Sequence, residues 1–174
     1  MRFVTARAAT ALAALSIIVP GAIVAAANRV DVRFTAPETF TDATYENRPA
    51  SRDEVTRDLA TILAKLGERY VPDGQQLALE VLDVDLAGRY EPWQQNGWDI
   101  RFMRDVTWPR IKFRYQLRDA SGATIGSGED QVNDMQYLTH PGAGFDSDRL
   151  RYEKVMLEDW FRKRFHPGAR SSSR

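Results

Sequence analysis

The sequence contains no cysteine and only two histidines in its 174 residues. Without cysteine there is no disulfide framework, no thiol nucleophile and no cysteine to which a lipid could be attached after export. Two histidines alone leave too few ligands for a zinc centre. The glycine-rich patterns of dinucleotide-binding and phosphate-binding loops are also absent. We therefore expect neither a metal ion nor a cofactor.

The chain also lacks an excess of charge of either sign, because 24 Lys and Arg residues balance 24 Asp and Glu residues. A near-neutral chain argues against nucleic acid as the main partner. The 43% of hydrophobic and 28% of charged residues are typical of a globular protein rather than a disordered one. The length is suited to one domain.

The first 27 residues differ in composition from the rest of the chain. Arg2 and Arg7 flank the start, residues 8–19 are almost entirely apolar, and small residues follow up to Ala27. A charged start, an apolar middle and a small-residue end are the three parts of a secretory signal peptide. We therefore expect cleavage after Ala27 and a soluble protein beyond the inner membrane, in the periplasm of a Gram-negative cell. Cleavage would leave 22 basic and 24 acidic residues.

An uncleaved membrane anchor is the alternative interpretation of the same segment. Residues 8–27 are just long enough to span a bilayer, but Pro20 and Gly21 interrupt them and alanine dominates. We therefore favour cleavage, which leaves residues 28–168 as a single domain with no membrane span. Residues 169–174 are expected to form a disordered tail. If the segment is retained, the chain would be an envelope subunit anchored in the inner membrane.

Hydrophobic spacing predicts the element order strand, helix, strand, strand, strand, strand, helix. The first helix is the clearest element, because five apolar residues after Ser51 share one face. Ser51 and Glu54 are expected to form a capping box at its start, and Gly67 to end it. The expected strands cover residues 29–34, 77–86, 100–108, 110–118 and 123–132, and the last helix covers residues 148–164.

These elements predict an α+β fold. A helix between the first two strands allows those strands to lie parallel, and a type I turn at residues 119–122 closes an antiparallel hairpin in which Leu117 lies opposite Ile125. The strand at 77–86 has apolar residues at both parities, so we expect it to be a central strand of the sheet or one covered on both sides. The result is a two-layer sandwich, with a mostly antiparallel sheet of about five strands and two helices on one face.

Three acidic residues near the end of the strand at 77–86 are candidates for chemistry. Asp83 and Asp85 point the same way on a strand, and with Glu91 they would offer three oxygen ligands to calcium. Calcium needs six or more oxygens, so we favour salt bridges to arginines at the sheet rim. As an alternative function, a small periplasmic hydrolase would use these three carboxylates as acid and base, with His140 in support.

Two further surfaces are candidates for binding. Trp93 and Trp98 lie on a polar loop, where they either grip a sugar or a partner or fold down on the edge of the core. We favour the second interpretation, because aromatic rings rarely stay fully exposed. Lys112, Arg114 and Arg118 form a possible basic patch on one strand. Acidic residues share the same faces, so a solvated face of mixed charge is the simpler interpretation.

Several stretches of the chain together carry a resemblance to a known family: residues 32–34 with 37–42, 83–88 with 91–92, 108–111, 134–137, and 152–154 with 159–161. This combination resembles a family of bacterial exported proteins known as domain of unknown function 3016. The resemblance spans nearly all of the chain after residue 27. It implies an exported single domain, and it assigns no activity, cofactor or catalytic residue to the chain. The residues themselves offer no catalytic constellation, whereas aromatic and mixed-charge surfaces are available for binding. We therefore expect a non-catalytic binding module of the cell envelope, with an envelope protein or a glycan as the candidate partner.

Overall fold

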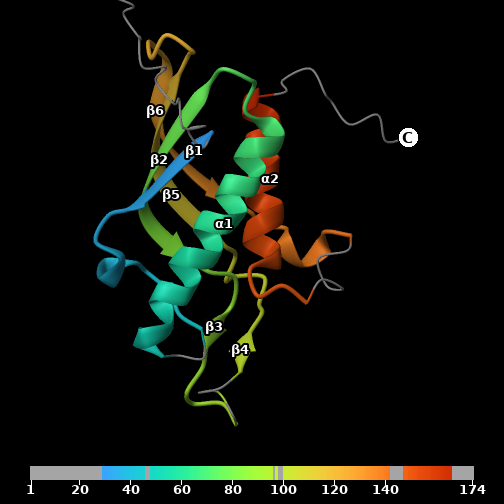
Figure 1. Ribbon diagram of the computed structural model, residues 1–174. Coiled ribbons are helices and arrows are strands. Elements are labelled where there is room, and N and C mark those ends of the chain that lie inside the picture. Colours follow the sequence, from blue (N-terminus) through green and yellow to red (C-terminus); the bar gives the residue numbers. More distant parts are fainter. Residues whose placement is uncertain (1–28, 46–47, 96, 98–99, 142–146, 166–174) are drawn as a thin grey trace, which may run out of the picture.

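The computed structural model describes residues 29–45, 48–95, 97, 100–141 and 147–165 (Figure 1). The expected signal peptide at 1–27, Trp98 and the expected tail at 169–174 lie outside these residues. Within them, no helix is both long enough and apolar enough to cross a membrane.

The main sheet has four strands in the spatial order β1-β2-β5-β6. β1 and β2 are parallel, as the helix between them predicts, and the other two pairs are antiparallel. The strands are β1 (Val30–Phe34), β2 (Gln76–Asp85), β5 (Arg110–Arg118) and β6 (Thr124–Asn133). The α+β class is therefore confirmed, with a mixed sheet.

Two helices, α1 (Arg52–Tyr70) and α2 (Arg151–Phe165), lie side by side against one face of this sheet (Figure 1). The apolar faces of both helices and the inward side chains of the sheet form one hydrophobic core. β5 contributes Ile111, Phe113 and Tyr115 to it by strict alternation, with polar residues between them. No helix of the described residues covers the other face of the sheet.

β2 contains a β-bulge between Val81 and Asp83. The extra residue, Leu82, resets the alternation of the strand, so Val84 is buried on the same side as Val81. Apolar residues at both parities therefore serve a single face, so the strand is not covered on both sides. Asp83 and Asp85 consequently lie on the face away from the helices. The place of β2 between β1 and β5 confirms the other expectation, that it is a central strand of the sheet.

The β5–β6 hairpin closes through the predicted turn, in which the Gly122 amide donates to the Asp119 carbonyl at 2.9 Å. Gly122 has a φ of 83°, which glycine adopts without strain. A second bulge follows, so Leu117 lies opposite Gly126 rather than Ile125. The predicted register is therefore wrong by one residue beyond the turn, because the extra residue of the bulge leaves no mark in the alternation of β6.

The predicted strand at 100–108 is wrong. Within the described part of this segment, β4 (Arg101–Phe102) alone is extended, and it pairs with β3 (Arg89–Tyr90) in a separate two-stranded sheet. Ile100 and Val106, which the pattern places on a buried face, are 48% and 65% exposed. The small sheet extends beyond the ends of α1 and β2 (Figure 1). This end of the molecule is called the β3–β4 end below.

The two ends of α1 also differ from the prediction. The Ser51 hydroxyl does not cap the helix. It accepts a hydrogen bond from the Tyr45 amide at 2.6 Å and lies within 2.7 Å of the carbonyl oxygens of Tyr45 and Arg48, so it fixes the turn before the helix. Gly67 does not end α1, which continues to Tyr70. The capping box and the glycine stop are therefore both wrong.

In the described part of the chain, three short 3-10 helices connect these elements. They are η1 (Pro37–Thr39), η2 (Pro49–Ser51) and η3 (Tyr137–Thr139). Tyr137 is fully buried and packs edge-on against Tyr152 of α2, with 4.8 Å between the ring centroids. Its hydroxyl donates to the carbonyl oxygen of Arg104 at 2.7 Å, which holds the segment after β4 against α2.

Candidate functional site

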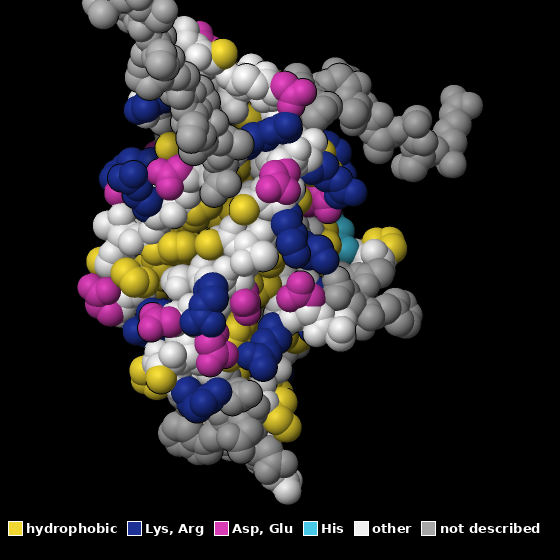
Figure 2. Space-filling view, in the orientation of Figure 1, with side chains coloured by type: hydrophobic (Ala, Val, Ile, Leu, Met, Phe, Trp, Pro, Cys, Tyr) yellow, Lys and Arg dark blue, Asp and Glu magenta, His cyan; other side chains and the backbone are white. Residues whose placement is uncertain are grey.

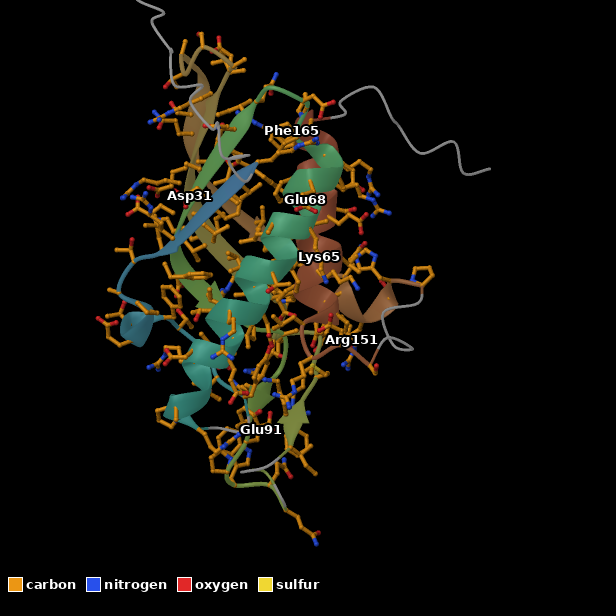
Figure 3. The ribbon with its side chains drawn as sticks, in the orientation of Figure 1. Asp31, Lys65, Glu68, Glu91, Arg151 and Phe165 are labelled. Carbon is orange, nitrogen blue, oxygen red and sulfur yellow. The ribbon has the colours of Figure 1, made fainter. Side chains whose placement is uncertain are left out.

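Three of the stretches that carry the family resemblance, 37–42, 83–88 and 152–154, meet near the β3–β4 end. Asp42 forms an isolated backbone bridge with Asp85. The backbone amide of Ala87, just after β2, donates to the Glu153 carboxylate of α2 at 2.7 Å. Arg151, at the start of α2, lies toward the same end of the molecule (Figure 3). Segments distant in sequence are thus brought together at this end of the molecule.

Asp83 is occupied by the segment that precedes α1. Its Oδ1 accepts a hydrogen bond from the Thr41 amide at 2.8 Å, and its Oδ2 accepts one from the Thr41 hydroxyl at 2.9 Å. Oδ1 also accepts the amide of Val84 at 2.9 Å. Both carboxylate oxygens therefore tie β2 to the chain after β1.

Asp85 is paired with an arginine of the adjacent strand. Arg110 lies directly opposite Asp85 in the sheet, and its Nε donates to Asp85 Oδ2 at 3.0 Å. Among the described residues, no group of three or more His, Asp or Glu side chains is arranged to hold a metal ion. Asp83 and Asp85 share a face of β2, but each already has an internal partner.

Glu91 is buried in the turn that follows β3. Arg104 binds it in a bidentate manner, from Nε to Oε1 at 2.7 Å and from Nη2 to Oε2 at 2.6 Å. Arg89 adds a longer contact of 3.4 Å. The hydrogen bonds from Arg104 hold the pKa of Glu91 below its usual range, against the opposing effect of burial. Glu91 is therefore an ionised group that fastens the β3–β4 turn (Figure 3).

Trp93 is the most exposed of the large hydrophobic residues described, with 69% of its surface accessible. Its ring does not cover the core, so the favoured core-capping interpretation is wrong for this residue. The guanidinium of Arg89 lies 5.7 Å from the ring centroid. Trp98, its predicted companion, lies outside the described residues.

The predicted basic patch lies on the sheet face opposite α1 and α2. Lys112 and Arg114 both pair with Glu129 of β6, at 2.8 and 3.1 Å, and Arg118 donates to Gln116 at 2.7 Å. This face forms a broad, open groove of about 980 Å³. The basic side chains are thus interleaved with acidic and amide groups along the groove.

His140 lies apart from the three carboxylates. Its Nε2 is 2.7 Å from Asp134 Oδ2, in a hollow that also contains Asp159 and Lys163 and none of Asp83, Asp85 and Glu91. The set of residues that the hydrolase alternative requires is therefore not gathered in this hollow.

A small cleft opens beside the end of β2 and is called the sheet-end cleft here. Its volume is about 180 Å³. Three tyrosines, two arginines, one carboxyl group and several apolar groups line it: Tyr45, Tyr90, Tyr152, Arg101, Arg149, Glu153, Leu86, Ala87 and Met103.

Glu153 is the unusual member of this lining, because only 1% of its surface is accessible. Its Oε1 accepts the Ala87 amide, whereas its Oε2 is buried and has no hydrogen-bond partner among the described residues. Burial raises the pKa of Glu153, and the Ala87 amide and the charges of Arg101 and Arg151 oppose this only in part. A buried carboxyl group of this kind, in a cleft, is a candidate for function.

Arg101 forms one side of the cleft and already has partners for its charge. Both of its Nη atoms donate to Asp42 Oδ2 at 2.8 Å, and Nη1 also reaches the carbonyl oxygen of Gly88 at 2.7 Å. Its guanidinium lies 4.9 Å from the ring centroid of Tyr90. Burial raises the pKa of Asp42, although the positive charge of Arg101 acts in the opposite direction.

The sequence does contain a signal for Glu153, which was missed. Glu153 lies three residues after Leu150 and four before Leu157, so it occupies the buried face of α2. A carboxylate at such a position is rare unless it is paired. Only its interruption of the apolar face distinguishes it from the other acidic residues of the helix.

Comparison with known protein families identifies the class to which this chain belongs. Residues 28–163 match the family described as "Protein of unknown function (DUF3016)", and the chain is a member of that family. The resemblance noted from the sequence is thereby confirmed. No curated protein and no solved structure matches the chain. The site must therefore be interpreted from its own geometry.

Glu153→Gln is expected to change how stability depends on pH. Because the folded pKa is raised, the unfolded chain ionises Glu153 above about pH 4.5 while the folded chain keeps it neutral. The stability that this group contributes is fully present below that pH and is lost as the pH rises toward the folded pKa. The loss is about 1.4 kcal/mol for each pH unit over which only the unfolded chain is ionised.

Glutamine never ionises and still offers an oxygen to the Ala87 amide. Between about pH 4.5 and pH 8 the variant should therefore lose less stability than the wild-type protein. Urea unfolding at both pH values measures the difference, and the titration of Asp42 is common to both proteins. Equal pH dependence of the two proteins would contradict a raised pKa of Glu153.

Proposed function

We propose that this protein is an exported, non-catalytic binding protein of the cell envelope, and that the sheet-end cleft is its ligand site. The observation that carries the proposal is the buried Oε2 of Glu153, which lacks a partner among the described residues, in a residue that lines one cleft with three tyrosines. An unsatisfied buried acceptor costs folding free energy and calls for an explanation. A ligand that donates a hydrogen bond there provides one.

The contacts of the other acidic residues support binding rather than catalysis. General acid–base catalysis needs carboxyl groups within reach of a substrate. Asp83, Asp85 and Glu91 are instead held by Thr41, Arg110 and Arg104 respectively. The hydrolase alternative would have to break these contacts before it could use them.

Two observations support export and a partner other than nucleic acid. The family match begins at residue 28, directly after the expected cleavage site. The face seen in Figure 2 carries interspersed basic and acidic side chains and no broad patch of one sign. Such a surface gives no electrostatic footprint for nucleic acid.

Export is tested by producing the full chain with a C-terminal tag in a Gram-negative host. We expect the protein in the periplasmic fraction, with Asn28 as its first residue when the N-terminus is sequenced. A full-length chain in the inner membrane would support the anchored alternative. Recovery from the cytoplasm would contradict both.

Binding is tested by recording the amide NMR spectrum of the purified protein against a panel of small amines, acids, sugars, envelope glycans and divalent metals. We expect at least one compound to move the Ala87 amide signal, and to raise the melting temperature because it binds only the folded state. The Asp83→Asn/Asp85→Asn variant should bind the same compound. Loss of binding in that variant would place the site at Asp83 and Asp85 instead of in the sheet-end cleft, and conversion of the compound to a product would support an enzyme.

A further inference from the structure

We infer that the sheet-end cleft takes a small organic ammonium ion; this inference rests on the proposed binding function and adds the class of the ligand. It follows from the balance of charge in the cleft, the chemistry of its walls and its size.

The charged groups of the cleft are balanced except at Glu153. Arg101 is paired with Asp42 through two hydrogen bonds of 2.8 Å. Arg149 lies 3.4 Å from a carboxylate oxygen of Glu54. Glu153 has no opposite charge within hydrogen-bond distance among the described residues. The charge of Arg151 acts on Glu153 only from beyond hydrogen-bond distance, so an ionised Glu153 has no cationic partner in contact with its Oε2. A guest that carries one positive charge and an N–H group can supply that contact.

The walls of the cleft suit a cation that carries carbon. The ring faces of Tyr45, Tyr90 and Tyr152 already attract guanidinium groups, with distances of 4.8, 4.9 and 4.6 Å from the arginine to the ring centroid. Aromatic faces attract ammonium groups in the same way. Leu86 and Met103 provide apolar contact for a short carbon chain.

The size of the cleft limits the guest. Its 180 Å³ is well below the roughly 300–1,000 Å³ of sites that hold drug-sized ligands. A short primary amine fits these limits. Its N–H groups would donate to Oε2 of Glu153 while its carbon chain lies against the tyrosines. An anion is disfavoured, because it would lie beside the Glu153 carboxyl group and the Nη donors of Arg101 are already engaged.

Binding of a cation should be coupled to the release of a proton. Three arginines face Glu153: Arg101 of β4, and Arg149 and Arg151 around the start of α2. Asp42, which is paired with Arg101, and the three tyrosines of the cleft face it from across the cleft. Burial raises the pKa of Tyr45, so that residue stays neutral. Glu153 must lose its proton to receive an ammonium ion, so affinity should increase with pH.

The test uses three probes of matched shape: propylammonium chloride, 1-propanol and sodium propionate, at constant ionic strength. Dissociation constants are obtained from the Ala87 amide signal at about pH 6 and about pH 8. We expect propylammonium to bind most tightly, and to bind severalfold more tightly at the higher pH. In Glu153→Gln its dissociation constant should increase about tenfold or more, as for loss of a charge-assisted hydrogen bond.

Glu68→Gln is the matched control, because it makes the same change at an exposed position of α1 away from the cleft (Figure 3). It should bind propylammonium as the wild-type protein does. Circular dichroism and thermal melting verify that Glu153→Gln is folded. We expect it to be, because glutamine still offers an oxygen to the Ala87 amide.

Each other outcome has a definite meaning. Equal or tighter binding of propanol or propionate at the cleft would overturn the ammonium assignment and leave the binding function standing. Unchanged binding of propylammonium in Glu153→Gln would overturn the role of Glu153. If no probe moves the Ala87 signal while another compound of the panel does, the ligand class is wrong. If nothing moves it, the proposed function fails as well.

Discussion

Gly67→Ala is expected to destabilise the protein by about 2 kcal/mol, although alanine normally stabilises a helix interior by up to about 1 kcal/mol relative to glycine. The opposite sign arises because α1 passes very close to β1 at this position. A Cβ added at Gly67 would lie 1.8 Å from Val30 Cγ2 and 3.0 Å from Val30 Cβ. Carbon atoms pack at about 3.5–4.0 Å, so the helix would have to move away from the strand. Overpacking of this kind costs about 1–3 kcal/mol, occasionally more.

A double-mutant cycle with Val30→Ala isolates this contact. Val30→Ala removes the Cγ2 atom that lies closest, so most of the cost of Gly67→Ala should disappear in that background. Urea unfolding of the four proteins gives the coupling free energy. The same cost in both backgrounds would mean that the approach of α1 to β1 is not the cause.

Gly67 also shows why the length of α1 was mispredicted while its face was not. The apolar spacing from Val55 to Leu66 is local, and it predicted the buried side of the helix correctly. A glycine at the end of that pattern suits a helix stop and a close approach to another element equally well. The difference depends on Val30, a residue of β1 that is distant in sequence.

The strands, like α1, were predicted correctly where local spacing decides their structure and incorrectly where it does not. β5 was predicted closely, because each inward residue is apolar and each outward residue is polar. β2 was predicted in extent but not in facing, although the change of parity around Leu82 was a visible sign of its bulge. The segment at 100–108 has apolar residues at alternate positions, yet a turn in which Thr107 donates to Arg104 interrupts it.

The candidate site was the least predictable part, because its members acquire their roles from distant partners. Asp83 and Asp85 stand out in the sequence as a close pair, but Thr41 and Arg110 engage them. Glu153 resembles any acidic residue of a helix until the amide of Ala87, 66 residues earlier, meets it. Burial and pairing are properties of the folded chain, so spacing alone could not rank these carboxylates.

Phe161→Ala is expected to destabilise the protein by about 3–5 kcal/mol, which is the usual cost of removing a fully buried aromatic ring. Phe161 has no accessible surface and lies at the centre of a group of aromatic rings. The ring centroids of Trp160, Phe165 and Tyr70 are 5.1, 5.8 and 6.3 Å away. The cavity would therefore open between α1 and α2, and the surrounding rings are too rigid to fill it.

Val106→Ala is the informative counterpart, because the sequence pattern marks both residues as inward-facing. Val106 is 65% exposed, so its truncation should change the free energy of unfolding by less than about 0.5 kcal/mol. Urea unfolding at one temperature measures both variants, and equal slopes with denaturant would indicate that the unfolded state is unchanged. A cost above about 1 kcal/mol for Val106→Ala would mean that the segment at 100–108 is a buried strand after all. The β3–β4 end would then be closed differently, and the sheet-end cleft, which Arg101 and Met103 help to form, would lose its basis.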